Sequence, residues 1–256
     1  MARMKYTDTV LRLTDGLVGT VTDFLLLNLY FLINAGSIKT MGDAWRVVEE
    51  VHDTLDVLNY QTIKKALYNL SSKGFVADLK TIEITKLGKQ RIEELIPTYK
   101  PKRPWDGHIY LVSYDVPTKH NKLRDVLREY IRRTGGALLQ ESLWINPYNP
   151  SLLLKEFVET HDIPGTVLVS KLGSDGAIGE ETLPDLIVRV YNLDELAARY
   201  EDFLETYRRP KGIPKTKITI DYLSILKHDP QLPFELLPKD FPDQKAWERY
   251  QALIRT

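Results

Sequence analysis

The chain of 256 residues contains no cysteine, which excludes disulfide bonds, thiol nucleophiles and zinc sites built on cysteine. The five histidines are scattered, and no two of them stand at the spacing that places two metal ligands on one helix. The sequence also lacks the phosphate-binding P-loop pattern and the Gly-x-Ser-x-Gly nucleophile motif. The common signatures of metalloenzymes, hydrolases and nucleotide-binding enzymes are therefore missing.

Long hydrophobic runs are absent as well. The most apolar stretch, residues 24–33, is about half as long as the roughly twenty residues that a membrane-spanning helix needs. Asp8, Asp15 and Asp23 precede this stretch and no small-residue cleavage site follows it directly, so we do not expect a signal peptide. The sequence predicts a cytoplasmic protein without a membrane segment.

Neither sign of charge dominates, because 35 lysines and arginines balance 35 aspartates and glutamates. Attraction to an anionic partner such as nucleic acid must therefore come from local patches. Residues 1–56 carry five basic and eight acidic side chains, whereas residues 57–103 carry ten basic and four acidic ones. The positive charge is thus concentrated in the second half of the N-terminal region.

The hydrophobic pattern of residues 1–98 is typical of a winged helix-turn-helix. Thr22 or Asp23 is a suitable cap for a buried helix that ends near Asn34. A second helix is expected over residues 41–52 and a third over 60–73. Two short strands and a trailing helix follow, over residues 75–78, 81–85 and 86–95.

In a winged helix the third helix normally enters the major groove of DNA, and the hairpin touches the backbone. Polar and cationic side chains on the outward face of that helix and around the hairpin are therefore candidates for DNA contact. They are Tyr60, Gln61, Thr62, Lys64, Lys65, Tyr68, Lys73, Lys80 and Lys86. The alternative is a winged helix used only for dimerisation or protein contact.

Residues 99–104, Tyr-Lys-Pro-Lys-Arg-Pro, have the composition of a stiff, solvated linker. Residues 105–191 then alternate between strand and helix patterns. We expect strands over 109–114 and 166–172, a pair of strands over 137–145, a helix over 119–133, and a second helix capped by Ser151 and ending at Thr160. This order is that of a ferredoxin-like βαββαβ domain. A glycine-containing loop and a further strand over 185–191 end it.

Residues 192–256 predict a C-terminal helical region, so the fold class is α+β with three parts. The first helix of the central domain is strongly basic on its outer face. Its cations include Lys119, Lys122, Arg124, Arg128 and Arg132. They predict either a second, non-specific DNA surface or a face that only keeps the helix soluble.

Three segments resemble one family. They are the central stretch from Trp105 to Ile145 (W-D-G…Y-L-V-S-Y-D-V-P…L-W-I), the passage Y-N-L-D-E-L-A-A-R-Y at 191–200, and H-D-P-Q-L-P-F-E-L-L-P-K-D-F-P at 228–242. All are similar to the PaaX family of bacterial transcriptional repressors, whose central domain resembles the CRISPR-associated protein 2 family. The resemblance implies a homodimer that binds double-stranded operator DNA and responds to a small effector such as an acyl-CoA.

The same resemblance offers a rival interpretation. An aspartate of the CRISPR-associated protein 2 family matches Asp115, and two copies in a dimer can share a Mg²⁺ or Mn²⁺ ion that activates water against a phosphodiester. The simpler hypothesis is that Asp115 caps the turn that follows and the N-terminus of the next helix. A third possibility is a dimeric scaffold that binds a protein or an acyl-CoA without regulating DNA.

Overall fold

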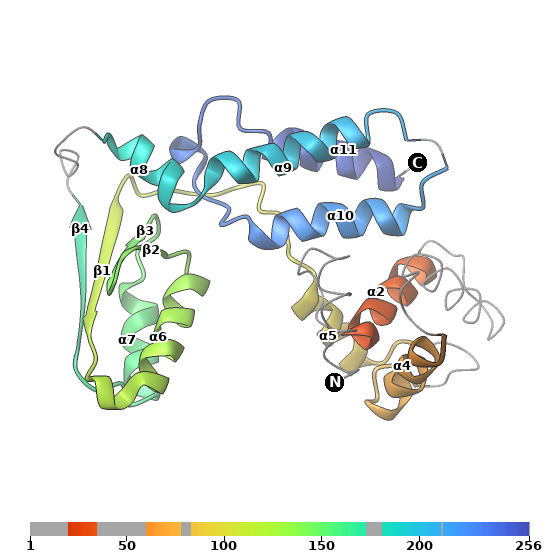
Figure 1. Cartoon of the computed structure of the whole chain (residues 1–256), viewed down its shortest axis with the longest axis horizontal. Helices are drawn as coiled ribbons and strands as arrows, with labels where there is room; N and C mark the ends of the chain where they lie inside the picture. Colours follow the sequence, from red (N-terminus) through yellow and green to blue (C-terminus); the bar gives the residue numbers. More distant parts are fainter. Residues whose placement is uncertain (1–19, 35–59, 78–82, 173–180, 211, 256) are drawn as a thin grey trace. The chain divides into compact units, whose positions relative to one another are not determined.

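The computed structural model describes residues 20–34, 60–77, 83–172, 181–210 and 212–255. Its chain divides into two compact units (Figure 1). The first consists of Met1–Tyr99, Tyr200–His228 and Lys245–Thr256, and the second of Lys100–Arg199 and Asp229–Gln244. Each unit is therefore built from segments that are far apart in the sequence.

The first unit contains α2 (Val21–Asn34), α4 (Tyr60–Ser72), α5 (Lys86–Leu95) and α10 (Lys215–His228). The apolar helix α2 packs against the other three, which explains why its apolar residues lie on every side. Phe24, Leu25, Leu26, Leu27 and Leu29 are buried, and burying each contributes roughly 1.5–3 kcal/mol. Among the described residues, no helix has the length and hydropathy to cross a membrane.

The cap of α2 differs from the prediction. Thr20, and not Thr22 or Asp23, supplies the capping hydroxyl: its Oγ1 accepts from the Asp23 backbone N–H at 3.0 Å and donates to Asp23 Oδ2 at 2.9 Å. A cap contacts the amide three residues ahead, so the helix begins at Val21, before the start of the apolar run at Phe24. The third predicted helix is confirmed as α4.

Only part of the predicted winged helix is described. Val76 pairs with Ile84 in an antiparallel bridge, and the Ala77 amide donates to the Glu83 carbonyl at 2.8 Å, as expected for the two ends of a hairpin. The predicted second helix, 41–52, and the wing tip lie outside the described residues. The winged helix therefore stays a prediction.

The C-terminal helices bring an aromatic cluster to the first unit. Besides α10 they are α9 (Leu193–Thr206) and α11 (Asp243–Arg255), which confirms the predicted helical region. The ring of Tyr222 stacks on Tyr250 with centroids 4.3 Å apart, and Tyr99 stacks on Trp247 at 4.9 Å. Large rings bury much surface for few rotatable bonds, so this cluster fixes how the helices pack.

The second unit holds a four-stranded antiparallel sheet with the order β2-β3-β1-β4. Its strands are β1 (Ile109–Asp115), β2 (Ala137–Gln140), β3 (Leu143–Asn146) and β4 (Thr166–Leu172). The helices α6 (Asn121–Arg133) and α7 (Ser151–Thr160) cover one face (Figure 1). Alternate strand residues such as Val112, Tyr114 and Trp144 pack against them. The predicted ferredoxin-like fold is confirmed.

The predicted strand at 185–191 is wrong, because this segment is the helix α8 (Leu183–Val190). Its β-branched residues, Ile187, Val188 and Val190, suggested a strand. The start of the helix has a capping box instead, in which Thr182 and Asp185 each bond the other's backbone N–H, and a proline stands in its first turn. These local signals outweigh the weak strand propensity.

Arg103 is an exception in the predicted solvated linker, where residues 100–102 and 104 are exposed. Its side chain is 0% exposed and its Nη2 lies 2.7 Å from Asp243 Oδ2. The other guanidinium nitrogens donate to the Leu232 and Lys100 carbonyls at 3.2 Å, and the ring of Phe234 lies 4.6 Å from the guanidinium carbon. Residues 229–244 therefore pack around the linker, and hydrogen bonds compensate for burial of its charge.

Candidate nucleic-acid interface

Helix α4 has one buried side and one polar side. Ile63, Ala66, Leu67 and Leu70 are buried on the side that packs against α2. The spacing of three and four residues puts these side chains on one stripe of the helix. The polar residues of α4 consequently project away from the core.

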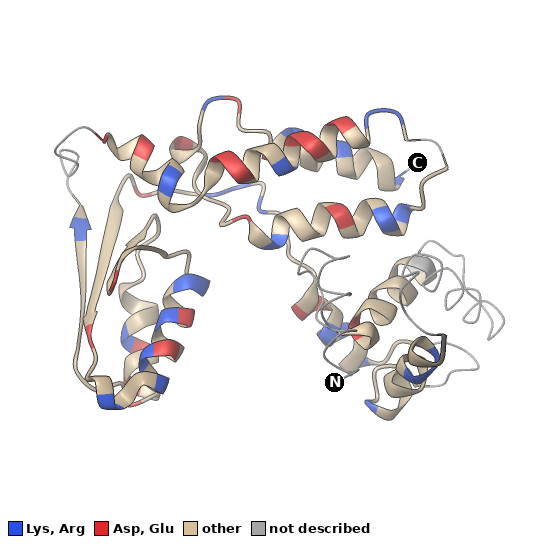
Figure 2. Cartoon of the chain, viewed as in Figure 1, with Lys and Arg blue, Asp and Glu red and all other residues tan. Residues whose placement is uncertain are grey.

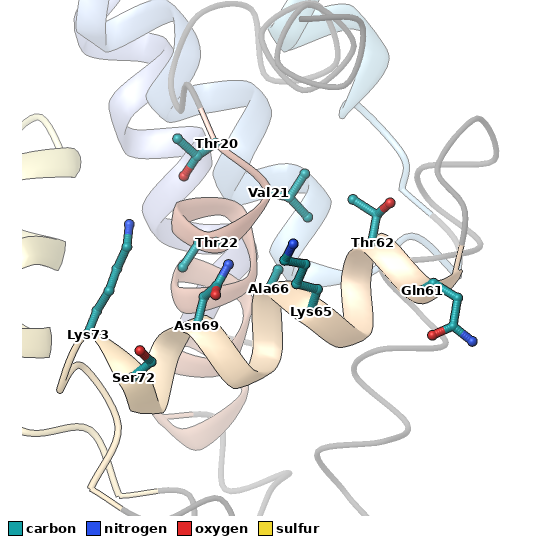
Figure 3. A pocket seen from close by; sticks show the side chains of 10 residues that line it. All are labelled: Thr20, Val21, Thr22, Gln61, Thr62, Lys65, Ala66, Asn69, Ser72 and Lys73. Atoms are coloured by element: carbon teal, nitrogen blue, oxygen red, sulfur yellow. The ribbon is translucent and has the colours of Figure 1, made fainter. Parts of the chain in front are cut away.

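A groove of about 710 Å³ lies between the start of α2 and α4 (Figure 3). The side chains of Lys65 and Lys73 extend toward the first turn of α2, whereas the end of Gln61 points away from it (Figure 3). Among the described residues that line the groove, two are lysines and none is acidic. They are Thr20, Val21, Thr22, Gln61, Thr62, Lys65, Ala66, Asn69, Ser72 and Lys73.

The structure divides the predicted DNA-binding residues into two groups. Gln61, Thr62, Lys65 and Lys73 line the groove. The remaining described candidates do not: Lys64 is half-buried and Tyr68 and Lys86 are exposed at other positions. Lys80 and the side chain of Tyr60 lie outside the described residues. The first group thus lies on one side of α4, along the groove.

The predicted DNA-binding residues did not include four polar residues of the groove, Thr20, Thr22, Asn69 and Ser72. Asn69 had a signal, because Gln61, Lys65 and Asn69 follow at four-residue steps and such residues share a stripe of a helix. Thr20 had none, since its place beside α4 depends on how two separate segments pack.

The acidic residue next to the groove is neutralised. Asp23, whose side chain is 6% exposed, forms a bidentate ion pair with Arg91 of α5, with distances of 2.9 Å to Nη2 and 3.0 Å to Nε. The hydrogen bond to Asp23 raises the pKa of the Arg91 guanidinium, and a second bond to Glu94 adds to this effect. Bidentate geometry is the strongest form of such a pair, so the carboxylate next to Thr22 carries little free charge.

The predicted second basic surface is largely engaged within the protein. Basic and acidic residues are interspersed along α6 (Figure 2). Arg132 and Arg133 contact Glu129 at 2.5 and 3.0 Å, and the pKa of that carboxyl is lowered chiefly by its hydrogen bond to Arg133. Ion pairs of this kind on a helix surface contribute little to stability, but they reduce the charge that a phosphate would meet.

Two other arginines of α6 hold the end of β1. Arg124 Nη2 donates to the Val116 carbonyl at 2.5 Å, and Arg128 Nε donates to the Tyr114 hydroxyl at 2.6 Å. Their role in the described structure is to fix the sheet to the helix. Of the five predicted cations, Lys119, Lys122 and Arg132 are exposed, and Arg132 is paired with Glu129.

Asp115 is the exposed last residue of β1. The prediction that it caps the following helix is wrong, because the residues at the cap positions are Pro117 and His120 and neither helix has a side-chain cap. Within the described residues, no group of three or more histidine, aspartate and glutamate side chains gathers to hold a metal ion. A Mg²⁺ or Mn²⁺ site shared with the Asp115 of a second copy stays a prediction.

Comparison with known proteins identifies the central and C-terminal parts of the chain. Residues 102–181 match the family model of the PaaX protein central Cas2-like domain, and residues 191–256 match that of the PaaX-like protein C-terminal domain. None of the curated proteins matches the chain.

A solved structure, the uncharacterized protein Rv0674 from Mycobacterium tuberculosis, resembles the fold with a TM-score of 0.53 and 19% identity. The match covers 77% of this chain and 81% of that one. The two family models together span more than half of the sequence and lie in the order that the motifs predicted. The chain belongs to the PaaX family.

Proposed function

We propose that this protein is a DNA-binding transcriptional regulator of the PaaX type, acting as a repressor, and that α4 contacts the duplex. The observation that carries the proposal is the polar stripe of α4, where Gln61, Lys65 and Asn69 border a groove whose described lining contains no acid. Membership of the family supports it independently.

The residue types on this stripe suit the two parts of DNA recognition. Lysine side chains bind phosphates and supply affinity that does not depend on sequence. Side-chain amides such as those of Gln61 and Asn69 pair with the base edges, adenine above all, in the major groove. A helix with lysines and side-chain amides on one stripe can both hold the protein on the DNA backbone and recognise the base sequence.

A homodimer and a small effector belong to the same proposal. Two copies of α4 would read half-sites separated by one or more turns of the duplex. An acyl-CoA is the effector class that the family suggests, and its binding would lower affinity for DNA by favouring a different conformation.

Fluorescence anisotropy tests the proposal with a labelled duplex from upstream of the coding sequence and a scrambled duplex of equal length. We expect tighter binding to the first duplex, and weaker binding to both as salt rises. Lys64→Ala and Lys65→Ala should weaken binding, Gln61→Ala should chiefly change sequence preference, and Arg128→Ala should change little.

Two outcomes would contradict the proposal. Failure to bind either duplex at low salt would favour the scaffold alternative, because phosphate contacts strengthen as salt falls. Equal losses in all four variants would show that α4 does not present a specific surface.

A further inference from the structure

We propose that the groove between α2 and α4 binds a phosphate of the DNA backbone. Arg91 is a positioning residue for this site, because its ion pair with Asp23 reduces the repulsion that an anion in the groove would meet. The inference rests on the proposed function and deepens it, because it assigns one part of the surface to the phosphate and names a residue that acts from outside the groove.

The two lysines of the groove lie on either side of Asn69. Lys65 and Lys73 lie about two helical turns apart, and both extend toward Thr20 and Val21 (Figure 3). Lys73 Nζ also lies 5.9 Å from the centroid of the Phe75 ring, a contact that is not a hydrogen bond. Ammonium and amide donors are the groups that hold a phosphate oxygen.

Asp23 is the obvious obstacle to an anion at this place. It directly follows Thr22, which lines the groove, and a carboxylate beside a phosphate is repulsive at short range. Arg91 removes this repulsion through its bidentate ion pair, while the Thr20 hydroxyl donates to the same carboxylate. Arg91 therefore aids binding without lining the groove itself.

The test compares groove variants with a matched surface lysine. Lys65→Ala and Lys73→Ala should each raise the Kd for duplex DNA about three- to tenfold near 100 mM salt, and should reduce the slope of log K against log salt by about one. Lys89→Ala removes an exposed lysine of α5 outside the groove and should leave both quantities unchanged.

A double-mutant cycle on Arg91 and Asp23 tests the positioning role of Arg91. Arg91→Gln should weaken binding, because it leaves the Asp23 carboxylate uncompensated. Arg91→Lys, which keeps the charge, should retain most of the affinity. The double variant Asp23→Asn/Arg91→Gln should recover binding, since neither charge remains. Thermal melts of every variant check the fold, and if Arg91→Gln does not fold, the neutral double variant carries the comparison.

The results separate this inference from the proposed function. If the wild-type protein binds the duplex but Lys65→Ala and Lys73→Ala behave like Lys89→Ala, the groove does not bind a phosphate and the regulator proposal stands. If the folded double variant stays as weak as Arg91→Gln, Arg91 contacts DNA directly and its positioning role is wrong. A wild-type protein that binds no duplex would overturn both.

Discussion

Gly165 has a backbone φ of +97° where the chain enters β4, and a Cβ atom at this position would lie 1.9 Å from the Asp115 carbonyl oxygen. Backbone atoms cannot move aside as a flexible side chain can, so a larger residue must separate β4 from the end of β1. The close pairing of Asp115 with Thr166 therefore depends on this glycine.

Gly165→Ala should lower the free energy of unfolding by more than about 2 kcal/mol, because it adds a clash to the strain of a positive φ. Gly107→Ala is the matched control, since Gly107 has a φ of +78° but no atom within 4 Å of the added Cβ; it should cost about 1–2 kcal/mol. Urea unfolding measures both. Equal losses would show that the clash is relieved.

The buried pair of Arg103 and Asp243 provides a second prediction for single residues. Arg103→Met should destabilise the protein by about 3–5 kcal/mol, because it leaves the Asp243 carboxylate buried without its partner. Arg103→Met/Asp243→Leu should lose less, as apolar side chains replace both charges. A double variant less stable than the single one in urea would disprove this account of the ion pair.

At the scale of elements, α8 shows how a cap decides between helix and strand. Its residues Ile187, Val188 and Val190 have the side chains of a strand, but Thr182, Pro184 and Asp185 form a strong helix start. The Tyr191 hydroxyl, directly after the helix, donates to the Gly135 and Ile145 carbonyls at 2.9 and 3.0 Å. The helix end is thereby fixed to the sheet.

Thr182→Ala should destabilise α8 by about 1 kcal/mol through loss of its cap. Hydrogen exchange of the α8 amides is the sensitive measurement, because a local loss need not alter global unfolding. Thr160→Ala, at the end of α7, removes a hydroxyl that bonds only within its own helix and should leave these amides unchanged. No change in Thr182→Ala would mean that tertiary packing alone maintains α8.

For the whole molecule, two compact units predict unfolding that is not two-state. We expect two calorimetric transitions. Arg103→Met should lower the transition temperature of the second unit. Tyr207→Phe removes a hydrogen bond to Asp221 in the first unit and should lower the transition temperature of that unit. A single transition whose calorimetric and van't Hoff enthalpies agree, shifted by both variants, would show that the units unfold together.

Much of the fold is predictable from periodicity. The strand at residues 166–172 has the predicted bounds and α7 ends at Thr160 as predicted, because a period of 2 or 3.6 is a local property of the sequence. The stripe of Gln61, Lys65 and Asn69 belongs to the same class of signal.

Ser151 was predicted as the cap of α7, but it is the first residue of the helix and Pro150 stands at the cap. The cap of α2 was predicted at Thr22 or Asp23 but is Thr20, and residues 185–191 were predicted as a strand but residues 185–190 belong to α8. Both errors arise because capping residues compete with hydrophobic patterns over only a few positions.

The sequence by itself determined the α+β class, the order of elements in the central domain and the family, since these depend on local periodicity and on motifs that can be read directly. Only the tertiary structure decided which charges are neutralised. Asp23 meets Arg91 68 positions later, and Arg103 meets Asp243 140 positions later. Such pairings arise when hydrophobic burial brings distant segments together, because that driving force is not directional and leaves no mark on the local sequence around either partner.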